Sequence, residues 1–132
     1  MNLVEKLLAT SKQQIEKATK KIKSKRLGRV IGEDYAEITI QEIDGRRINQ
    51  IKQMSRGQNG DDGYEQNLLC CLHGIVEQDL KNEELQKKFG VTTPKDLCEK
   101  LFNAEVYIIA DEIMDVSGLN KTEDKVKDDV KN

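Results

Sequence analysis

Aromatic residues and proline are scarce in this chain, and both shortages limit how it can fold. The 132 residues include no tryptophan, two phenylalanines, three tyrosines and one proline. The core must therefore be built mainly from aliphatic side chains. A chain of this length is expected to form one domain, which can bury roughly two thirds of its unfolded surface without disulfides or metals.

Long apolar runs are also lacking. No stretch of the sequence approaches the roughly 20 apolar residues that a transmembrane helix needs. The apolar stretch near the N-terminus is short and contains Glu5 and Lys6, which does not fit a secretory signal. We therefore expect a cytoplasmic protein with no membrane partner.

Residues that commonly carry catalysis are few. The only histidine is His73, no serine lies in a GxSxG sequence, and the carboxylates fall mainly on the polar faces of predicted helices. The glycine-rich stretch 57–63 lacks the ligand spacing of a calcium loop and follows no predicted strand, so it is interpreted as a flexible connector. We predict no enzyme, no catalytic residue and no cofactor.

The chain contains three cysteines, a small and odd number. Cys70 and Cys71 lie in an apolar helical pattern, and Cys98 follows Leu97. An adjacent cysteine pair with a single histidine does not supply the four paired ligands of a structural zinc site. The three thiols are therefore predicted to be small buried hydrophobic groups, and no metal site is expected.

Charge is distributed unevenly along the chain. Residues 1–29 contain nine Lys and Arg against two Glu, a net charge of +7, whereas the remainder, with 13 basic and 22 acidic residues, has −9. This asymmetry suits a basic arm that reaches a polyanion, or head-to-tail association of like subunits. It equally suits a solvated basic face that folds back on an acidic body.

Most large apolar side chains occur between residues 63 and 119, at helical spacing. Gly90 is predicted to end one helix there, and Thr93 and Pro94 are predicted to begin the next as N-cap and first residue. A final helix is expected from about Asn103 until Gly118. The predicted apolar contacts of this helical core are Leu68, Leu69, Leu72, Ile75, Val76, Leu80, Leu85, Phe89, Leu97, Cys98, Leu101, Phe102, Val106, Ile109, Ile113 and Val116.

The N-terminal half predicts shorter elements. Residues 2–10 predict a short amphipathic helix, residues 11–21 a linker or weak helix, and residues 27–32 a brief helical turn. Residues 34–43 alternate as a strand that buries Ala36, Ile38 and Ile40, followed by a turn at Asp44-Gly45 and a helix to about residue 56. Residues 21–27 are the natural antiparallel partner of that strand. The fold class is α+β, predominantly α-helical, with a helical core and a small antiparallel two-stranded element near the N-terminal third.

The order of these segments resembles a known family. An LVEKLL helix, a basic KRLGRVIGE segment, a strand-turn-helix AEITIQEIDGRRINQI and the stretch GIVEQDLKNEELQKKFGVTTPKDL occur in sequence, ahead of a last helix that ends DVSGLN. This order is similar to the XkdN-like tail assembly chaperones of tailed phages and phage-tail-like particles such as tailocins and prophage remnants. The similarity covers residues 2 to 120. It implies one chaperone-like domain over residues 1–119, comprising the 1–10 helix, a 21–56 strand-turn-helix part and the 63–119 core, with a charged flexible tail over 120–132.

The resemblance implies a non-enzymatic role in virion assembly in the bacterial host cytoplasm. Members of the family are thought to bind the tape measure protein and to keep it soluble until the tail tube polymerises around it. The tail tube protein and a frameshifted longer form of the chain are further partners that the resemblance implies. The charge asymmetry adds a homo-oligomer as a further candidate. The alternative function is that of a small nucleic-acid-binding or regulatory protein that uses the basic N-terminal arm. No stacking aromatics accompany that arm, so nucleic acid is not the expected partner.

Ten residues are predicted to contact a partner. An exposed apolar helix face can bind another amphipathic helix through anchors at i, i+3, i+4 and i+7. The alternative for its four apolar residues is plain core packing, and the sequence leaves both open. The predicted contacts are Leu3, Val4, Leu7 and Leu8 on the first helix, and Lys20, Lys21, Lys23, Lys25, Arg26 and Arg29 on the basic segment.

Overall fold

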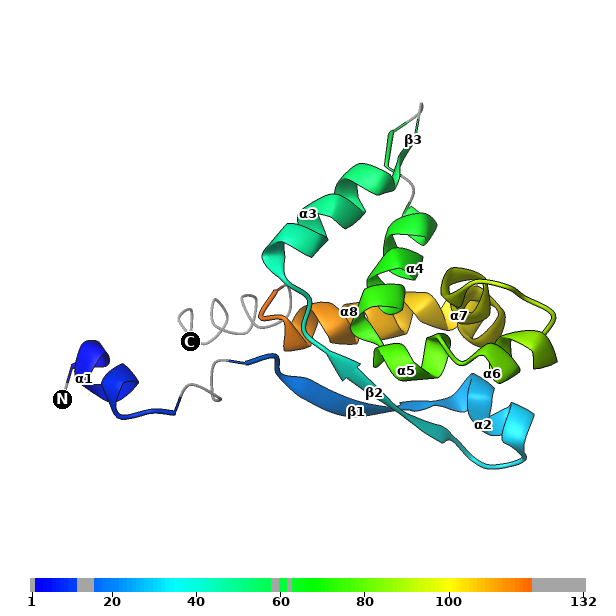
Figure 1. Cartoon of the computed structure of the whole chain (residues 1–132), viewed down its shortest axis with the longest axis horizontal. Coiled ribbons are helices and arrows are strands. Elements are labelled where there is room, and N and C mark those ends of the chain that lie inside the picture. Colours follow the sequence, from blue (N-terminus) through cyan, green and yellow to red (C-terminus); the bar gives the residue numbers. More distant parts are fainter. Residues whose placement is uncertain (1, 12–15, 58–59, 62, 120–132) are drawn as a thin grey trace, which may run out of the picture.

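The computed structural model describes residues 2–11, 16–57, 60–61 and 63–119. The predicted tail 120–132 therefore lies outside the described residues. Helices predominate, and a two-stranded antiparallel sheet lies beside them, so the predicted α+β class is confirmed. Figure 1 shows the sheet crossing below the helices of the core, with the first helix set apart from both.

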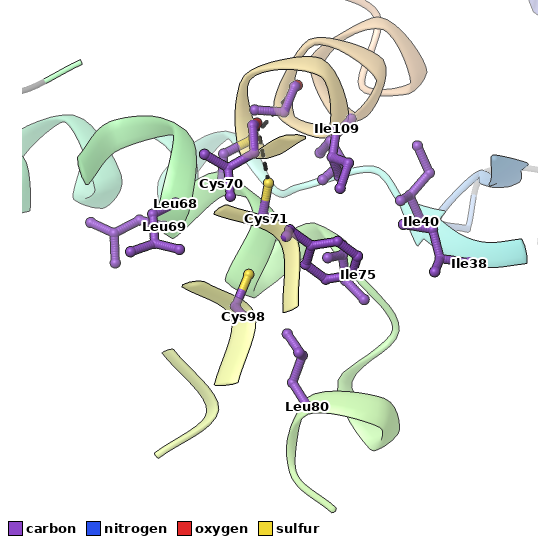
Figure 2. Packing of buried hydrophobic residues seen from close by; sticks show 14 of the residues in the cluster. Ile38, Ile40, Leu68, Leu69, Cys70, Cys71, Ile75, Leu80, Cys98 and Ile109 are labelled. Carbon is purple, nitrogen blue, oxygen red and sulfur yellow. Dashed lines mark hydrogen bonds between the residues drawn. The ribbon is translucent and has the colours of Figure 1, made fainter. Parts of the chain in front are cut away.

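Two helices that are distant in the sequence form the centre of the core. Helix α4 (Gly63–Gly74) packs against α8 (Val106–Val116), and α7 (Pro94–Phe102) closes a further side. The approach of α4 to α8 is close, since a Cβ atom on Gly74 would lie 2.5 Å from Cδ1 of Ile113. The Cys71 thiol donates a hydrogen bond of 3.4 Å to the carbonyl of Val106, as Figure 2 shows.

The helix signals within the core are confirmed. Thr93 caps α7, because its hydroxyl accepts the backbone N–H of Asp96 at 3.0 Å, and Pro94 is the first residue of the helix. Helix α6 (Glu83–Lys88) ends before Gly90, which has a φ of 72°. The short helices α5 (Glu77–Leu80) and η2 (Asn103–Glu105) connect these elements. The last helix thus starts at Val106, after a 3₁₀ turn that begins at the predicted Asn103.

The sheet consists of β1 (Thr19–Ser24) and β2 (Ala36–Gln41), joined by α2 (Lys25–Ile31). Its core-facing side chains include Ile38 and Ile40, whose exposed fractions are 8% and 0%, as the alternation predicted. Ser24 ends β1 and caps α2, because its hydroxyl accepts the N–H of Leu27 at 3.1 Å. The prediction that residues 21–27 form the partner strand is therefore correct in kind, but the strand is shifted toward the N-terminus by the cap at Ser24.

Helix α3 (Gly45–Met54) follows β2, which confirms a strand-turn-helix rather than a hairpin at this point. Two other predictions are wrong. The connector at 57–63 contains part of a small hairpin, β3 (Arg56–Gly57) with β4 (Gly60–Asp61). Ile75 and Val76 do not continue α4, because the chain leaves the helix at Gly74 and the N–H of Val76 pairs with the carbonyl of Thr39 on β2 at 3.0 Å.

Candidate interaction surfaces

The first candidate surface is the apolar face of α1 (Leu3–Leu8). The side chain of Asn2 caps this helix by accepting the N–H of Glu5 at 2.9 Å. None of its residues is buried, and Figure 1 shows α1 standing apart from the core. The exposed fractions are 69% for Leu3, 64% for Val4, 56% for Leu7 and 80% for Leu8. Within this structure the four residues thus form an uncovered apolar face rather than part of the core.

The second candidate surface is the basic segment, which forms β1 and α2 rather than a free arm. Lys20 on β1 forms an ion pair of 2.8 Å with Glu112 on α8. Lys21 lies 3.5 Å from Glu37 on β2, and the ammonium group of Lys23 lies 4.4 Å from the centre of the Tyr35 ring. The Lys21–Glu37 pair is largely exposed and the Lys20–Glu112 pair partly so, and such surface pairs contribute little to stability. They do show that the basic strand lies against acidic and aromatic residues of the same chain.

Helix α2 is held against the core by Glu105. This carboxylate accepts the hydroxyl of Ser24 at 2.6 Å and the N–H of Arg26 at 3.2 Å. The guanidinium group of Arg26 also donates to the carbonyl of Leu101 at 3.0 Å, just before the end of α7. An anion at a helix N-terminus is favoured by the unpaired N–H groups there. Arg26 is thus a structural residue here, which the sequence pattern alone did not distinguish from its neighbours.

Lys25 and Arg29 are exposed on α2. Together with Asp34 they line a surface hollow next to Asn103 and Glu105. Of the ten predicted contact residues, the structure therefore brings the four on α1 together as one face, and divides the six basic ones between strand, helix and intramolecular pairs.

Comparison with known proteins agrees with this architecture and with the order of segments. Residues 4–131 match the model of the family described as Phage XkdN-like tail assembly chaperone protein. The chain belongs to this family. No curated protein matches it.

Among solved structures, the tail assembly chaperone chain is similar to the crystal structure of the protein YqbN. The TM-score is 0.55 at 12% sequence identity, over 77% of this chain and 87% of that chain. At this level of identity the likeness concerns the fold alone.

No group of three or more His, Cys, Asp or Glu among the described residues could hold a metal ion. None of the described helices is long and apolar enough to span a membrane. His73 is partly buried at the end of α4, and its carbonyl accepts the side-chain amide of Gln41 at 3.5 Å.

The three thiols are buried, as predicted, and the surroundings of Cys70 and Cys71 disfavour ionisation. Burial raises the pKa of Cys70 to about 12. A hydrogen bond with Cys98, and then burial, raise the pKa of Cys71. Thiolates are the reactive form of cysteine, so these side chains act as packing groups. Burial and a hydrogen bond to Glu99 raise the pKa of the Tyr64 hydroxyl to about 12.

Sequence reasoning missed other exposed apolar side chains on the folded body. Val30 and Ile31 end α2, Met54 ends α3, and Ile108 lies in the first turn of α8, with exposed fractions between 56% and 66%. The sequence contains no signal for their exposure, because apolar spacing along a helix does not show which positions a distant element covers. They are dispersed over separate elements and do not repeat along one helix as the α1 residues do.

Proposed function

We propose that this tail assembly chaperone binds the tape measure protein of its phage or phage-tail-like particle, and keeps it soluble in the host cytoplasm until the tail tube polymerises. The observation that carries the proposal is the apolar face of α1. Four apolar side chains lie on six residues of helix, and all four are more than half exposed. Exposed apolar surface that is contiguous commonly marks a protein–protein contact.

The chemistry of this face suits a helical client. Residues at i, i+3 and i+4 on α1 can insert between the apolar side chains of another amphipathic helix. Complete burial of a leucine side chain is worth about 1.5–3 kcal/mol, so a single copy would bind weakly. A long client with many such helices would collect several copies, and the fraction of its sites that are covered would rise with the concentration of this chain.

The test is co-expression with the longest helical protein encoded directly downstream, followed by size-exclusion chromatography with light scattering. We expect a soluble complex that contains several copies of this chain for each client. The double substitution Leu3→Ser and Leu7→Ser should return the client to the insoluble fraction. Met54→Ser is the matched control, because Met54 is 62% exposed but lies on α3, and it should leave the complex intact.

A client that stays insoluble while the chain elutes alone would contradict the proposal. Equal loss of the complex in the α1 double variant and in Met54→Ser would place the contact elsewhere. Binding to nucleic acid stays a separate prediction. In that case the affinity of this chain for nucleic acid should fall steeply as salt rises, with a slope set by the number of phosphates neutralised. Pairing of Lys20 with Glu112 and of Lys21 with Glu37 offers that alternative no support.

A further inference from the structure

The two edges of the β1–β2 sheet differ. On the outer edge of β2, the carbonyl of Thr39 accepts the N–H of Val76 at 3.0 Å, and Ile40 lies opposite Ile75 in an isolated bridge. The chain that leaves α4 therefore covers this edge. Among the described residues, no comparable segment covers the outer edge of β1. The principal neighbour of β1 is β2, on its inner edge.

The register identifies which main-chain groups of β1 face outward. Neighbouring residues of an antiparallel strand alternate between pairs that exchange hydrogen bonds and pairs that do not. The N–H of Glu42 donates to the carbonyl of Ala18 at 2.9 Å, and Thr39, which is opposite Lys21, directs its carbonyl away from β1. Even-numbered residues of β1 therefore pair with β2. Odd-numbered ones direct their N–H and C=O outward, namely Thr19, Lys21 and Lys23.

These outward groups are accessible. Thr19, Lys21 and Lys23 are exposed, and no described residue forms a main-chain hydrogen bond with them at the outer edge. An uncovered strand edge is a template on which another extended segment can pair. The edge has room for about five residues of a partner strand, since each residue of β1 advances about 3.3 Å.

The side chains along the edge determine which segment fits. Three of the six residues of β1 are lysines, and Lys25 follows directly. Like charges opposite each other in a strand pair are unfavourable, so two copies of β1 would repel if they paired edge to edge. An incoming strand with carboxylates at alternate positions would instead place them beside Lys21 and Lys23, which lie on the solvent face and have only exposed partners, Glu37 and Tyr35.

We infer that the outer edge of β1 binds an extended acidic segment of a partner protein by β-strand addition, through the main chain of Thr19, Lys21 and Lys23. This surface is separate from α1, so the inference does not depend on the proposed binding of the tape measure protein. Strand addition supplies affinity through main-chain hydrogen bonds, and the lysines supply the preference for an acidic sequence.

The test uses a capped heptapeptide in which Glu alternates with Val or Thr, and a control peptide with Lys in place of each Glu. Amide hydrogen exchange by NMR should show slower exchange at residues 19, 21 and 23 when the acidic peptide is added. The amides of residues 20 and 22 already pair with β2 and should change little. The lysine peptide should give no protection, because it repeats the charge of the edge.

Substitutions separate main-chain pairing from charge. Lys21→Pro removes an outward N–H and should abolish protection by the peptide while the protein stays folded, since edge strands tolerate proline. Lys20→Pro is the matched control, which removes an N–H that pairs with β2 and should lower stability. Lys21→Thr with Lys23→Thr keeps the strand but removes two charges, and should weaken peptide binding by about fivefold.

The edge lysines could instead serve only to keep the strand unpaired. In that case the acidic peptide would give no alternating protection to the wild-type protein. This result overturns the inference, as does equal protection by the acidic and the lysine peptide. If Lys21→Pro proves unfolded in a thermal melt, the double threonine variant still decides whether charge directs the binding.

Discussion

Helices α1 and α8 are both rich in aliphatic residues, yet their burial is opposite. Every apolar side chain of α1 is more than half exposed, whereas Val106, Ile109 and Ile113 of α8 have exposed fractions of 0–3%. Helix α8 has eleven residues and packs along α4, while α1 has six and is set apart from the core. Helical periodicity thus indicates which side chains share a face, but not whether the same chain covers that face.

The largest expected difference between α1 and the buried core is in thiol reactivity. Leu7→Cys would place an exposed thiol on α1, in addition to the three buried native thiols of the core. At pH 8 the thiolate fraction of Cys70 should be about a thousandfold below that of a free thiol, because its pKa is about 12 against the usual 9.0. Only the thiolate reacts. Labelling with a disulfide reagent should therefore show one fast thiol in the variant and none in the wild type, until denaturant releases the others. Fast reaction of Cys70 or Cys71 in the folded wild type would contradict the described packing.

Truncation of a buried side chain on α8 should strongly lower the stability of the protein. Ile113 is fully buried against Gly74, and Ile113→Ala should lower the free energy of unfolding by about 3–4 kcal/mol through lost burial and an unfilled cavity. Ile108→Ala on the same helix is the control, since Ile108 is 66% exposed. Urea denaturation followed by circular dichroism measures both. Similar losses for the two variants would show that α8 does not have the buried face described above.

A smaller loss is expected where α2 meets the start of β2. A Cβ atom on Gly28 would lie 2.5 Å from the Cα of Tyr35 and 2.6 Å from its nitrogen. The backbone must move to admit a methyl group, so Gly28→Ala should cost about 2 kcal/mol. Gly45→Ala, at a helical glycine with open space around it, should be neutral or slightly stabilising in the same urea titration. If Gly28→Ala left the free energy of unfolding unchanged, α2 would not pack against the backbone of Tyr35 as described.

The smallest effect should come from α1 itself. Leu7→Ala keeps helix propensity and removes a side chain that is 56% exposed, so the free energy of unfolding should change by less than about 0.5 kcal/mol. The same variant is expected to weaken binding to the client. Thermal or urea denaturation tests the first expectation and co-expression the second. A loss of about 2 kcal/mol in stability would show that α1 packs on the core in solution, contrary to its position in this structure.

Local signals in the sequence predicted the elements well where neighbours within four residues decide them. The cap at Thr93, the stop at Gly90 and the alternation around Ile38 and Ile40 are all of this kind. Predictions failed where a distant segment intervenes. Val76 leaves the helical pattern because it pairs with Thr39, which lies 37 positions earlier in the chain.

The candidate surfaces divide in the same way. The apolar face of α1 could be predicted from spacing, although whether the core would cover it could not. The basic segment was recognised by composition, but its incorporation into β1 and α2 depends on Glu112 and Glu105, which lie 92 and 81 positions from Lys20 and Ser24. Which main-chain groups of β1 face outward depends on the register with β2, and no property of the β1 sequence alone specifies that register.

The sequence by itself determined the family, the helical core with its small sheet, and the burial of the three cysteines. Each of these follows from the order of segments, from apolar periodicity, or from the small size and low polarity of the thiol. Only the tertiary structure decided that α1 stays uncovered, that Arg26 is held by Glu105 and the end of α7, and that one edge of the sheet is covered while the other is open. These features depend on which distant elements meet, and that is set by packing of the whole chain rather than by any local pattern.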